Sequence, residues 1–177
     1  MVIDKRVLIL LLCMIGLNTA HASLITKGFK WLGDGGYKAQ GTLIYDDNFT
    51  TVTDSAGINF LEISFFDPSN ALVFNTIDVQ NGVVLYGSLD LTFDATTMEF
   101  LGSFDMGADT GNPGELFLAG DIGGASDLTD SETFATLDQI AVDTSITVFD
   151  IPEPGILALV GLGLAGIRFQ RNRQARS

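Results

Sequence analysis

The chain has 177 residues, 46% of them hydrophobic, and its 22 acidic residues outnumber nine lysines and arginines, for a formal net charge of −13. This negative charge opposes binding to nucleic acid and to anionic lipid headgroups. The single cysteine, Cys13, and the single histidine, His21, both lie near the start of the chain. The rest of the chain therefore has no disulfide, no histidine–cysteine zinc site and no Ser–His or Cys–His nucleophile pair.

The first segment has the pattern of a secretory signal peptide. Lys5 and Arg6 precede an apolar run over residues 7–17, and Ala20 and Ala22 are small residues at the positions that a signal peptidase reads. We expect residues 1–22 to be removed by cleavage before Ser23. An uncleaved N-terminal anchor is the alternative, but 11 apolar residues are few for a membrane span.

Residues 23–150 are predicted to form one domain, since they suffice for a hydrophobic core. They contain 20 acidic residues and three lysines, so the net charge of this domain is about −17. Apolar and polar residues alternate in Leu61-Glu62-Ile63-Ser64-Phe65, which is the period of a half-buried strand. A longer alternation over residues 83–94, followed by another over residues 98–106, predicts a β-hairpin with Asp90 and Asp94 facing solvent.

Further candidate strands cover residues 39–45, 72–77, 115–122 and 140–149, with Gly, Asn, Asp and Pro residues between them. This pattern predicts an all-β fold, an antiparallel β-sandwich with jelly-roll-like connections. A short helix is expected only at residues 130–139, behind a Thr129 cap. The Gly-x-Gly-Gly segment at residues 33–36 has no helix signal after it, which indicates a turn and not a phosphate-binding loop.

The sequence of this domain offers two candidate ligand sites, one for calcium and one for a glycan. Asp105, Asp109 and Asn112 lie in one Gly-rich stretch and offer oxygen ligands of the kind that calcium prefers, with solvated turn residues as the alternative. Another loop holds Asp121 and Asp127, and no loop has the EF-hand spacing.

The second candidate site is aromatic. Trp31, Tyr37 and Tyr45 lie close together in sequence and could contact a glycan through their ring faces. Packing in the core is the alternative for the single tryptophan. Catalysis, if present, would need a pair of carboxylates across a cleft, as in glycoside hydrolysis. Asp46 with Asp47 and the Asp90–Asp94 pair are examples, and a solvated face explains such pairs equally well.

Residues 151–177 have a separate organisation. Pro152, Glu153 and Pro154 precede an apolar run from Gly155 to Ile167, and four arginines follow. A strand cannot continue through the two prolines. A helix over about residues 155–169 is a marginal membrane span when Arg168 snorkels to the headgroups, and the arginines favour a cytoplasmic C-terminus.

This segment resembles the PEP-CTERM sorting signal, a module also called the ice-binding protein C-terminal domain. The residues that carry the resemblance are Pro152, Glu153, Pro154, Arg168, Arg171 and Arg173. It implies recognition by the membrane protease-transpeptidase exosortase, cleavage near the Pro-Glu-Pro triplet, and delivery to the cell surface or an exopolysaccharide matrix. Ile151 stands where the family commonly has valine. A plain single-pass anchor is the alternative.

The sequence thus predicts an exported, non-catalytic surface or matrix protein. Its expected partners are signal peptidase, exosortase, the inner membrane during transit and an exopolysaccharide, with no nucleic acid and no cofactor except calcium. An exported carbohydrate-active enzyme that uses carboxylates or calcium is the second hypothesis. A permanently anchored membrane protein is the third.

Overall fold

The computed structural model describes residues 23–54, 56–86 and 89–151. The predicted signal peptide and the predicted membrane helix lie outside these residues. All regular elements in the described part of the chain are strands, and all their ladders are antiparallel. Across these residues there is no helix long and apolar enough to cross a bilayer. The prediction of an antiparallel all-β fold is confirmed.

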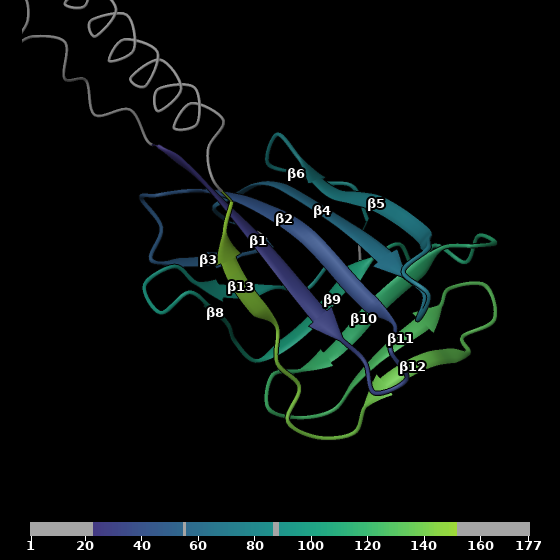
Figure 1. Cartoon of the computed structure of the whole chain (residues 1–177). Coiled ribbons are helices and arrows are strands. Elements are labelled where there is room, and N and C mark those ends of the chain that lie inside the picture. Colours follow the sequence, from purple (N-terminus) through teal and green to yellow (C-terminus); the bar gives the residue numbers. More distant parts are fainter. Residues whose placement is uncertain (1–22, 55, 87–88, 152–177) are drawn as a thin grey trace, which may run out of the picture.

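The largest sheet has six strands and contains both ends of the described chain. Their order is β13 (Thr147–Asp150), β1 (Leu24–Leu32), β2 (Lys38–Asp46), β4 (Ile58–Phe66), β5 (Leu72–Gln80) and β6 (Val83–Val84). The strand β13 lies at one edge, beside β1 (Figure 1). Because residue 150 ends β13, the Pro-Glu-Pro triplet begins two residues after the folded sheet.

Two smaller sheets complete the domain. One has the order β12 (Thr136–Ile140), β11 (Ser126–Asp130), β10 (Leu116–Asp121) and β9 (Ser103–Gly107). The other has the order β3 (Thr51–Thr53), β7 (Thr92–Asp94) and β8 (Glu99–Phe100). Successive strands mostly pair within one sheet, so the connections are those of meanders, and the predicted jelly-roll connections are not observed. Only β13 returns from the far sheet to lie beside the first strand.

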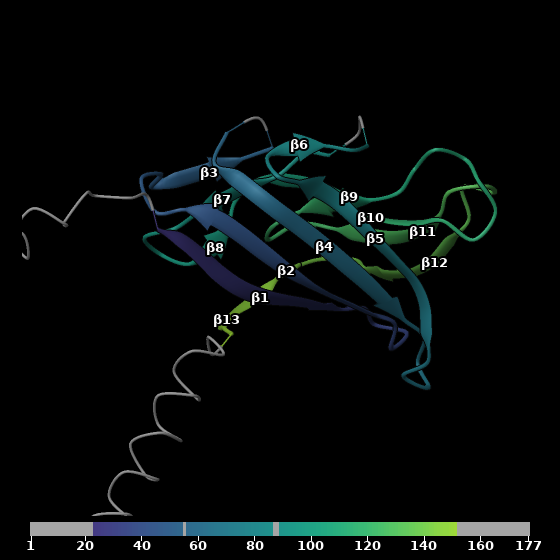
Figure 2. The same cartoon turned by 90° about the horizontal axis from the view of Figure 1, so that it is seen from above.

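The core lies between the six-stranded sheet and the two smaller sheets, which face it from one side (Figures 1 and 2). Phe29 on β1 packs edge-on against Phe100 on β8, with ring centroids 5.4 Å apart. Trp31 reaches across to β11, where its indole Nε1 donates to the Ser126 hydroxyl at 3.0 Å. Alternating residues of every long strand thus point into a single core.

The predicted long hairpin forms only in part. β7 and β8 pair through a turn in which the Asp94 carboxylate accepts the N–H groups of Thr96 and Thr97. The strand before it is broken, because β6 pairs with β5 in the large sheet and leaves Val83 and Leu85 exposed. Residues 83–94 therefore contribute to two different sheets, β6 to the six-stranded sheet and β7 to the three-stranded sheet.

Two further expectations near the C-terminus are wrong. Residues 130–139 form no helix: β11 ends at Asp130, a tight turn with Phe134 at φ 53° follows, and β12 begins at Thr136. The Asp130 carboxylate accepts from Thr133 and closes this turn. Residues 140–149 are also not one strand, because a loop separates β12 from β13.

The turn at residues 33–36 is confirmed, and its glycines have a specific reason. Asp138 on β12 directs its carboxylate at this turn and accepts the N–H groups of Gly35 at 2.7 Å and Tyr37 at 2.9 Å. A Cβ at Gly33 would lie 2.3 Å from that carboxylate. The turn is therefore a backbone cradle for a buried acid of the chain itself, which links the β1–β2 connection to the far sheet.

Candidate functional site

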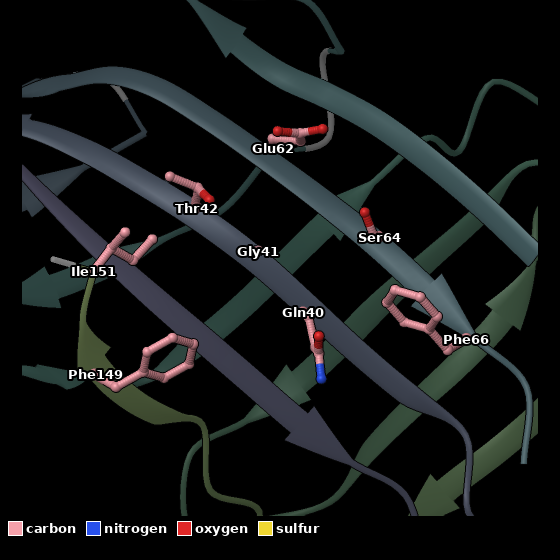
Figure 3. A pocket seen from close by; sticks show the side chains of 8 residues that line it. All are labelled: Gln40, Gly41, Thr42, Glu62, Ser64, Phe66, Phe149 and Ile151. Atoms are coloured by element: carbon pink, nitrogen blue, oxygen red, sulfur yellow. The ribbon is translucent and has the colours of Figure 1, made fainter. Parts of the chain in front are cut away.

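The outer face of the six-stranded sheet carries a shallow hollow (Figure 3). In the described part of the chain, no further layer of strands lies over the central strands on this face (Figure 1). The volume of the hollow is about 260 Å³. The floor is formed by outward-facing polar residues of the two central strands β2 and β4, together with Gly41, which lies between two of them. These floor residues are Gln40, Gly41, Thr42, Glu62 and Ser64.

Apolar side chains form the walls of the hollow. Phe66 at the end of β4 stands on one side, and Phe149 and Ile151 stand on the other, with Gln40 between the two rings (Figure 3). Phe149 is 46% exposed, so a ring face is open to solvent. Its position depends on Gly28 on β1, because a Cβ there would lie 2.2 Å from the Phe149 ring.

Two residues of the polar floor are held in place by side-chain hydrogen bonds between β4 and β5. Asn75 on β5 donates from its amide nitrogen to Glu62 Oε1 at 2.9 Å and to Ser64 Oγ at 2.8 Å. Ser64 is the cross-strand partner of both Gln40 and Asn75. Asn75 therefore restrains the side chains of Glu62 and Ser64, which still have lone pairs and a hydroxyl proton available for further hydrogen bonds.

A second hollow of about 230 Å³ adjoins the first through a shared residue, Gln40. It is lined by Lys30 and Leu32 of β1 and by Lys38 of β2, over the backbone of Trp31. The side chain of Lys38 donates to Asn70 Oδ1. Together the two hollows form a continuous polar and aromatic strip across the sheet.

A separate group of acids lies at the junction of β5 and β9. Asp78 is 0% exposed, and its Oδ2 accepts the N–H of Gly107 at 2.7 Å. Burial raises the pKa of Asp78 to about 6 in spite of that hydrogen bond. The pKa of Asp105 is also raised to about 6, first by burial and then by the charges of Asp109, Asp78 and Asp90.

Three buried side-chain oxygens in the described residues have no hydrogen-bond partner, and all three belong to this region. They are Thr76 Oγ1, Asp78 Oδ1 and Asp105 Oδ1. Buried polar atoms of this kind destabilise a fold unless a proton, an ion or water satisfies them. The ionised carboxylates of this region lower the free energy of unfolding at neutral pH, so the stability of the fold depends on pH.

Of the predicted calcium ligands, only Asp105 belongs to this group of buried acids, and the three residues lie on a strand, after it and in a turn. Asp105 is in β9, Asp109 follows that strand, and Asn112 is in an exposed turn. There the Asn112 amide donates to Thr110 and to Glu115 Oε1. Within the described chain, no group of three or more acidic, histidine or cysteine side chains could hold a metal ion. Calcium binding at these residues stays a prediction.

The predicted glycan contacts need correction. Trp31 and Tyr45 are each 1% exposed and belong to the core, so neither ring face is open to a sugar. Tyr45 packs against Phe93, with ring centroids 5.4 Å apart. Tyr37 is half-buried at the β1–β2 turn. Strand parity explains the error, because Trp31 and Tyr45 are at inward positions of β1 and β2.

Sequence reasoning also overlooked the residues that line the hollow. The outward-facing positions of the predicted strands hold the polar residues of the floor, Gln40, Thr42, Glu62 and Ser64. Their alternation with apolar residues predicts a solvent-facing surface, but it does not predict a hollow. The hollow requires the ring of Phe149, which comes from a strand more than a hundred residues later in the chain.

The sorting residues Pro152, Glu153, Pro154, Arg168, Arg171 and Arg173 lie outside the described residues, as do Ala20 and Ala22 of the predicted cleavage site. Ser23 is described. Its N–H donates to Asp47 Oδ1 at 3.0 Å, and its carbonyl accepts the Asp47 N–H at 3.0 Å. The first described residue is therefore attached to the turn after β2.

An acidic all-β domain that runs from its last strand directly into a Pro-Glu-Pro triplet, an apolar stretch and arginines has the layout of an exported, sorted protein. The family model described as PEP-CTERM protein-sorting motif matches residues 150–174. The chain is therefore a PEP-CTERM sorting domain-containing protein, and this motif implies an exported protein with an exosortase as its processing partner. No curated protein and no solved structure matches the chain.

Proposed function

We propose that the chain is a non-catalytic protein of the cell surface or of an exopolysaccharide matrix, and that its acidic body, a β-sandwich in our interpretation, is the part delivered there. The observation that carries this proposal is the sorting motif at residues 150–174, which begins in the last residue of β13. In this proposal residues 1–22 are removed by signal peptidase. The apolar segment then holds the precursor in the inner membrane until exosortase acts.

A non-catalytic role is supported by the chemistry of the body. Residues 23–150 contain neither histidine nor cysteine. The two acids whose pKa is raised to about 6 are Asp78 and Asp105, and Asp78 is fully buried, so it is out of reach of a substrate. No specific observation favours the alternative of a carboxylate-based or calcium-dependent carbohydrate-active enzyme.

The test follows the C-terminus of the chain in cells that contain an exosortase. Intact-protein mass spectrometry of the surface fraction is expected to find a chain that begins at Ser23 and ends near Pro152–Pro154. Replacing Glu153 by Ala should leave the precursor in the inner membrane with Arg168–Arg176 retained. A surface protein that keeps these arginines would support a plain membrane anchor instead.

The matched control uses an acidic residue of the body. Asp127→Asn removes one negative charge from the exposed face of β11 and lies away from β13. It should be exported and trimmed like the parent chain. Loss of trimming in both variants would mean that reduced expression or folding, and not the sorting motif, explains the effect of Glu153→Ala.

A further inference from the structure

We propose that the hollow on the outer face of the six-stranded sheet binds an uncharged polysaccharide chain. This inference rests on the proposed function, since it names the matrix component that the delivered body would contact. Three properties of the hollow lead to it: open aromatic walls, a preorganised polar floor, and a location on a strongly acidic domain.

The walls supply the apolar contact that a sugar ring needs. A pyranose presents a face of C–H groups, and aromatic rings bind such faces by dispersion and by burial of apolar area. Phe149 is 46% exposed and Phe66 is half-buried, so both rings have accessible surface on this side of the sheet. Phe149 covers β1 at Gly28, and Phe66 ends β4, two strand spacings across the sheet, which is about 10 Å, and four residues further along the strands, which is about 13 Å. The span between the two positions is therefore about 16 Å, roughly the length of three linked sugar rings.

The floor supplies directional hydrogen bonds between the rings. The Glu62 carboxylate accepts from sugar hydroxyls, Gln40 both donates and accepts, and the hydroxyls of Thr42 and Ser64 do the same. Because Asn75 already holds Glu62 and Ser64, little side-chain freedom is lost when a ligand binds. A floor this polar suits a sugar and does not suit an apolar helix or a hydrophobic protein partner.

Charge decides which polysaccharide fits. The body carries a net charge of about −17, and one of its negative charges, that of Glu62, lies inside the hollow itself. A polyanion such as a uronate polymer would be repelled on approach and would bring its carboxylates next to Glu62. Lys30 and Lys38 lie at one end of the strip, in the neighbouring hollow. An uncharged chain avoids the repulsion and still uses every hydrogen-bonding group.

The experiment measures binding of hexasaccharides to the full-length chain in detergent micelles by isothermal titration calorimetry. The neutral probes are hexamers of β-1,4-glucan, β-1,3-glucan, β-1,4-xylan and β-1,4-mannan, and the acidic probe is an alginate hexamer. We expect at least one neutral hexamer to bind. Phe66→Ala and Gln40→Ala should each weaken that binding about tenfold or more.

The control is Phe134→Ala, which removes an equally large ring that is 71% exposed at the turn between β11 and β12, away from this face. It should leave the affinity unchanged. Gly28→Ala is a second variant that leaves the floor intact but displaces the Phe149 ring. It should weaken binding as Phe66→Ala does, and the fluorescence of buried Trp31 reports whether each variant remains folded.

The inference is overturned if no neutral hexamer binds, if only the alginate hexamer binds, or if the outer-face variants bind as well as the parent chain. These outcomes are separate from failure of the proposed function. A chain that is exported and trimmed but binds no neutral hexamer contradicts only the hollow. A chain that binds such a hexamer but is never trimmed contradicts the sorting.

Discussion

Replacing Asp78 by Asn should make the stability of the protein much less dependent on pH. Asp78 is buried at the β5–β9 junction with one carboxylate oxygen bonded to the Gly107 N–H and the other without a partner. The neighbouring ionisable groups are also carboxylates. The negative charge of Asp109 raises the pKa of Asp78, and the charges of Asp109, Asp78 and Asp90 raise the pKa of Asp105. The folded state therefore favours the protonated form of Asp78.

The size of the effect follows from the raised pKa. Burial raises the pKa of Asp78 from 3.8 to about 6, and each pH unit between the folded and unfolded pKa is worth about 1.36 kcal/mol. The charged form thus lowers the free energy of unfolding by about 3 kcal/mol above pH 6. The sign is fixed, because a raised folded pKa gives stability that is complete below pH 3.8 and is lost as pH rises through about 6. Between pH 4 and pH 7.5 the loss from Asp78 amounts to about 2.5 kcal/mol.

The assay is urea denaturation of the full chain in mild detergent at several pH values, followed by fluorescence of Trp31, the single tryptophan and a core residue. The free energy difference between Asp78→Asn and the parent should grow by about 2.5 kcal/mol from pH 4 to pH 7.5. Asp127→Asn is the control, since it removes the same charge from an exposed position. Acids with lowered pKa, such as Asp94 and Asp130, act in the opposite direction below pH 4 but are common to all three proteins. Parallel curves for Asp78→Asn and the parent would refute the reasoning.

Three further predictions concern the cradle, the core and calcium. Asp138→Ala should lower the free energy of unfolding by about 3 kcal/mol in the same urea assay, because three backbone N–H groups lose their buried acceptor; an effect under about 1 kcal/mol would contradict this. Trp31→Phe should cost about 1 kcal/mol, measured by circular dichroism, because the hydroxyl of Ser126 loses its indole donor, and an unchanged midpoint would count against it. If Asp105 and Asp109 are calcium ligands, millimolar calcium should raise the thermal unfolding midpoint at pH 7.5, and Asp109→Asn should remove that rise. A midpoint that is the same with and without calcium would contradict this prediction.

The strands that the sequence predicts are those whose neighbours in the fold require no unusual residue within the strand. Leu61, Ile63 and Phe65 alternate with polar residues because β4 has one face on the core and one face in solvent. That period is visible in a single sequence. β1 was missed, since Gly28 and the flanking lysines interrupt its apolar pattern. The glycine is there for the ring of Phe149, a contact between residues at opposite ends of the domain.

The candidate sites were harder to predict for the same reason. Asp78 ends an apolar run and looks like a turn residue, yet it lies inside β5 because the N–H of Gly107 provides its hydrogen bond. The hollow exists only because the ring of Phe149 on β13 lies over Gly28 of β1, beside the polar residues of β2 and β4. The sorting motif, in contrast, is a contiguous stretch in which the triplet, the apolar run and the arginines follow one another, so it can be recognised without knowledge of any tertiary contact.

Signal-peptide cleavage before Ser23 should create an ion pair that the precursor lacks. In the uncleaved chain the amide N–H of Ser23 donates to Asp47 Oδ1 at 3.0 Å. Cleavage turns that amide nitrogen into an ammonium group with a pKa of about 7.7 to 8.0. The positive charge then faces the Asp47 carboxylate at the same place. Asp47→Asn should therefore destabilise the processed chain at pH 7, by at most about 1 kcal/mol because the pair is exposed.

The same substitution should have a smaller effect in a chain whose Ser23 amine is acetylated, because an amide can offer a hydrogen bond but no charge. The stability difference between Asp47→Asn and the parent should also fall to that of the acetylated chain above about pH 9, where the ammonium loses its proton. Urea denaturation of the free and the acetylated forms at pH 7 and pH 9 measures both effects. Equal losses in the free and acetylated chains would show that Asp47 acts only by closing its turn, and cleavage would then add nothing to the stability of the body.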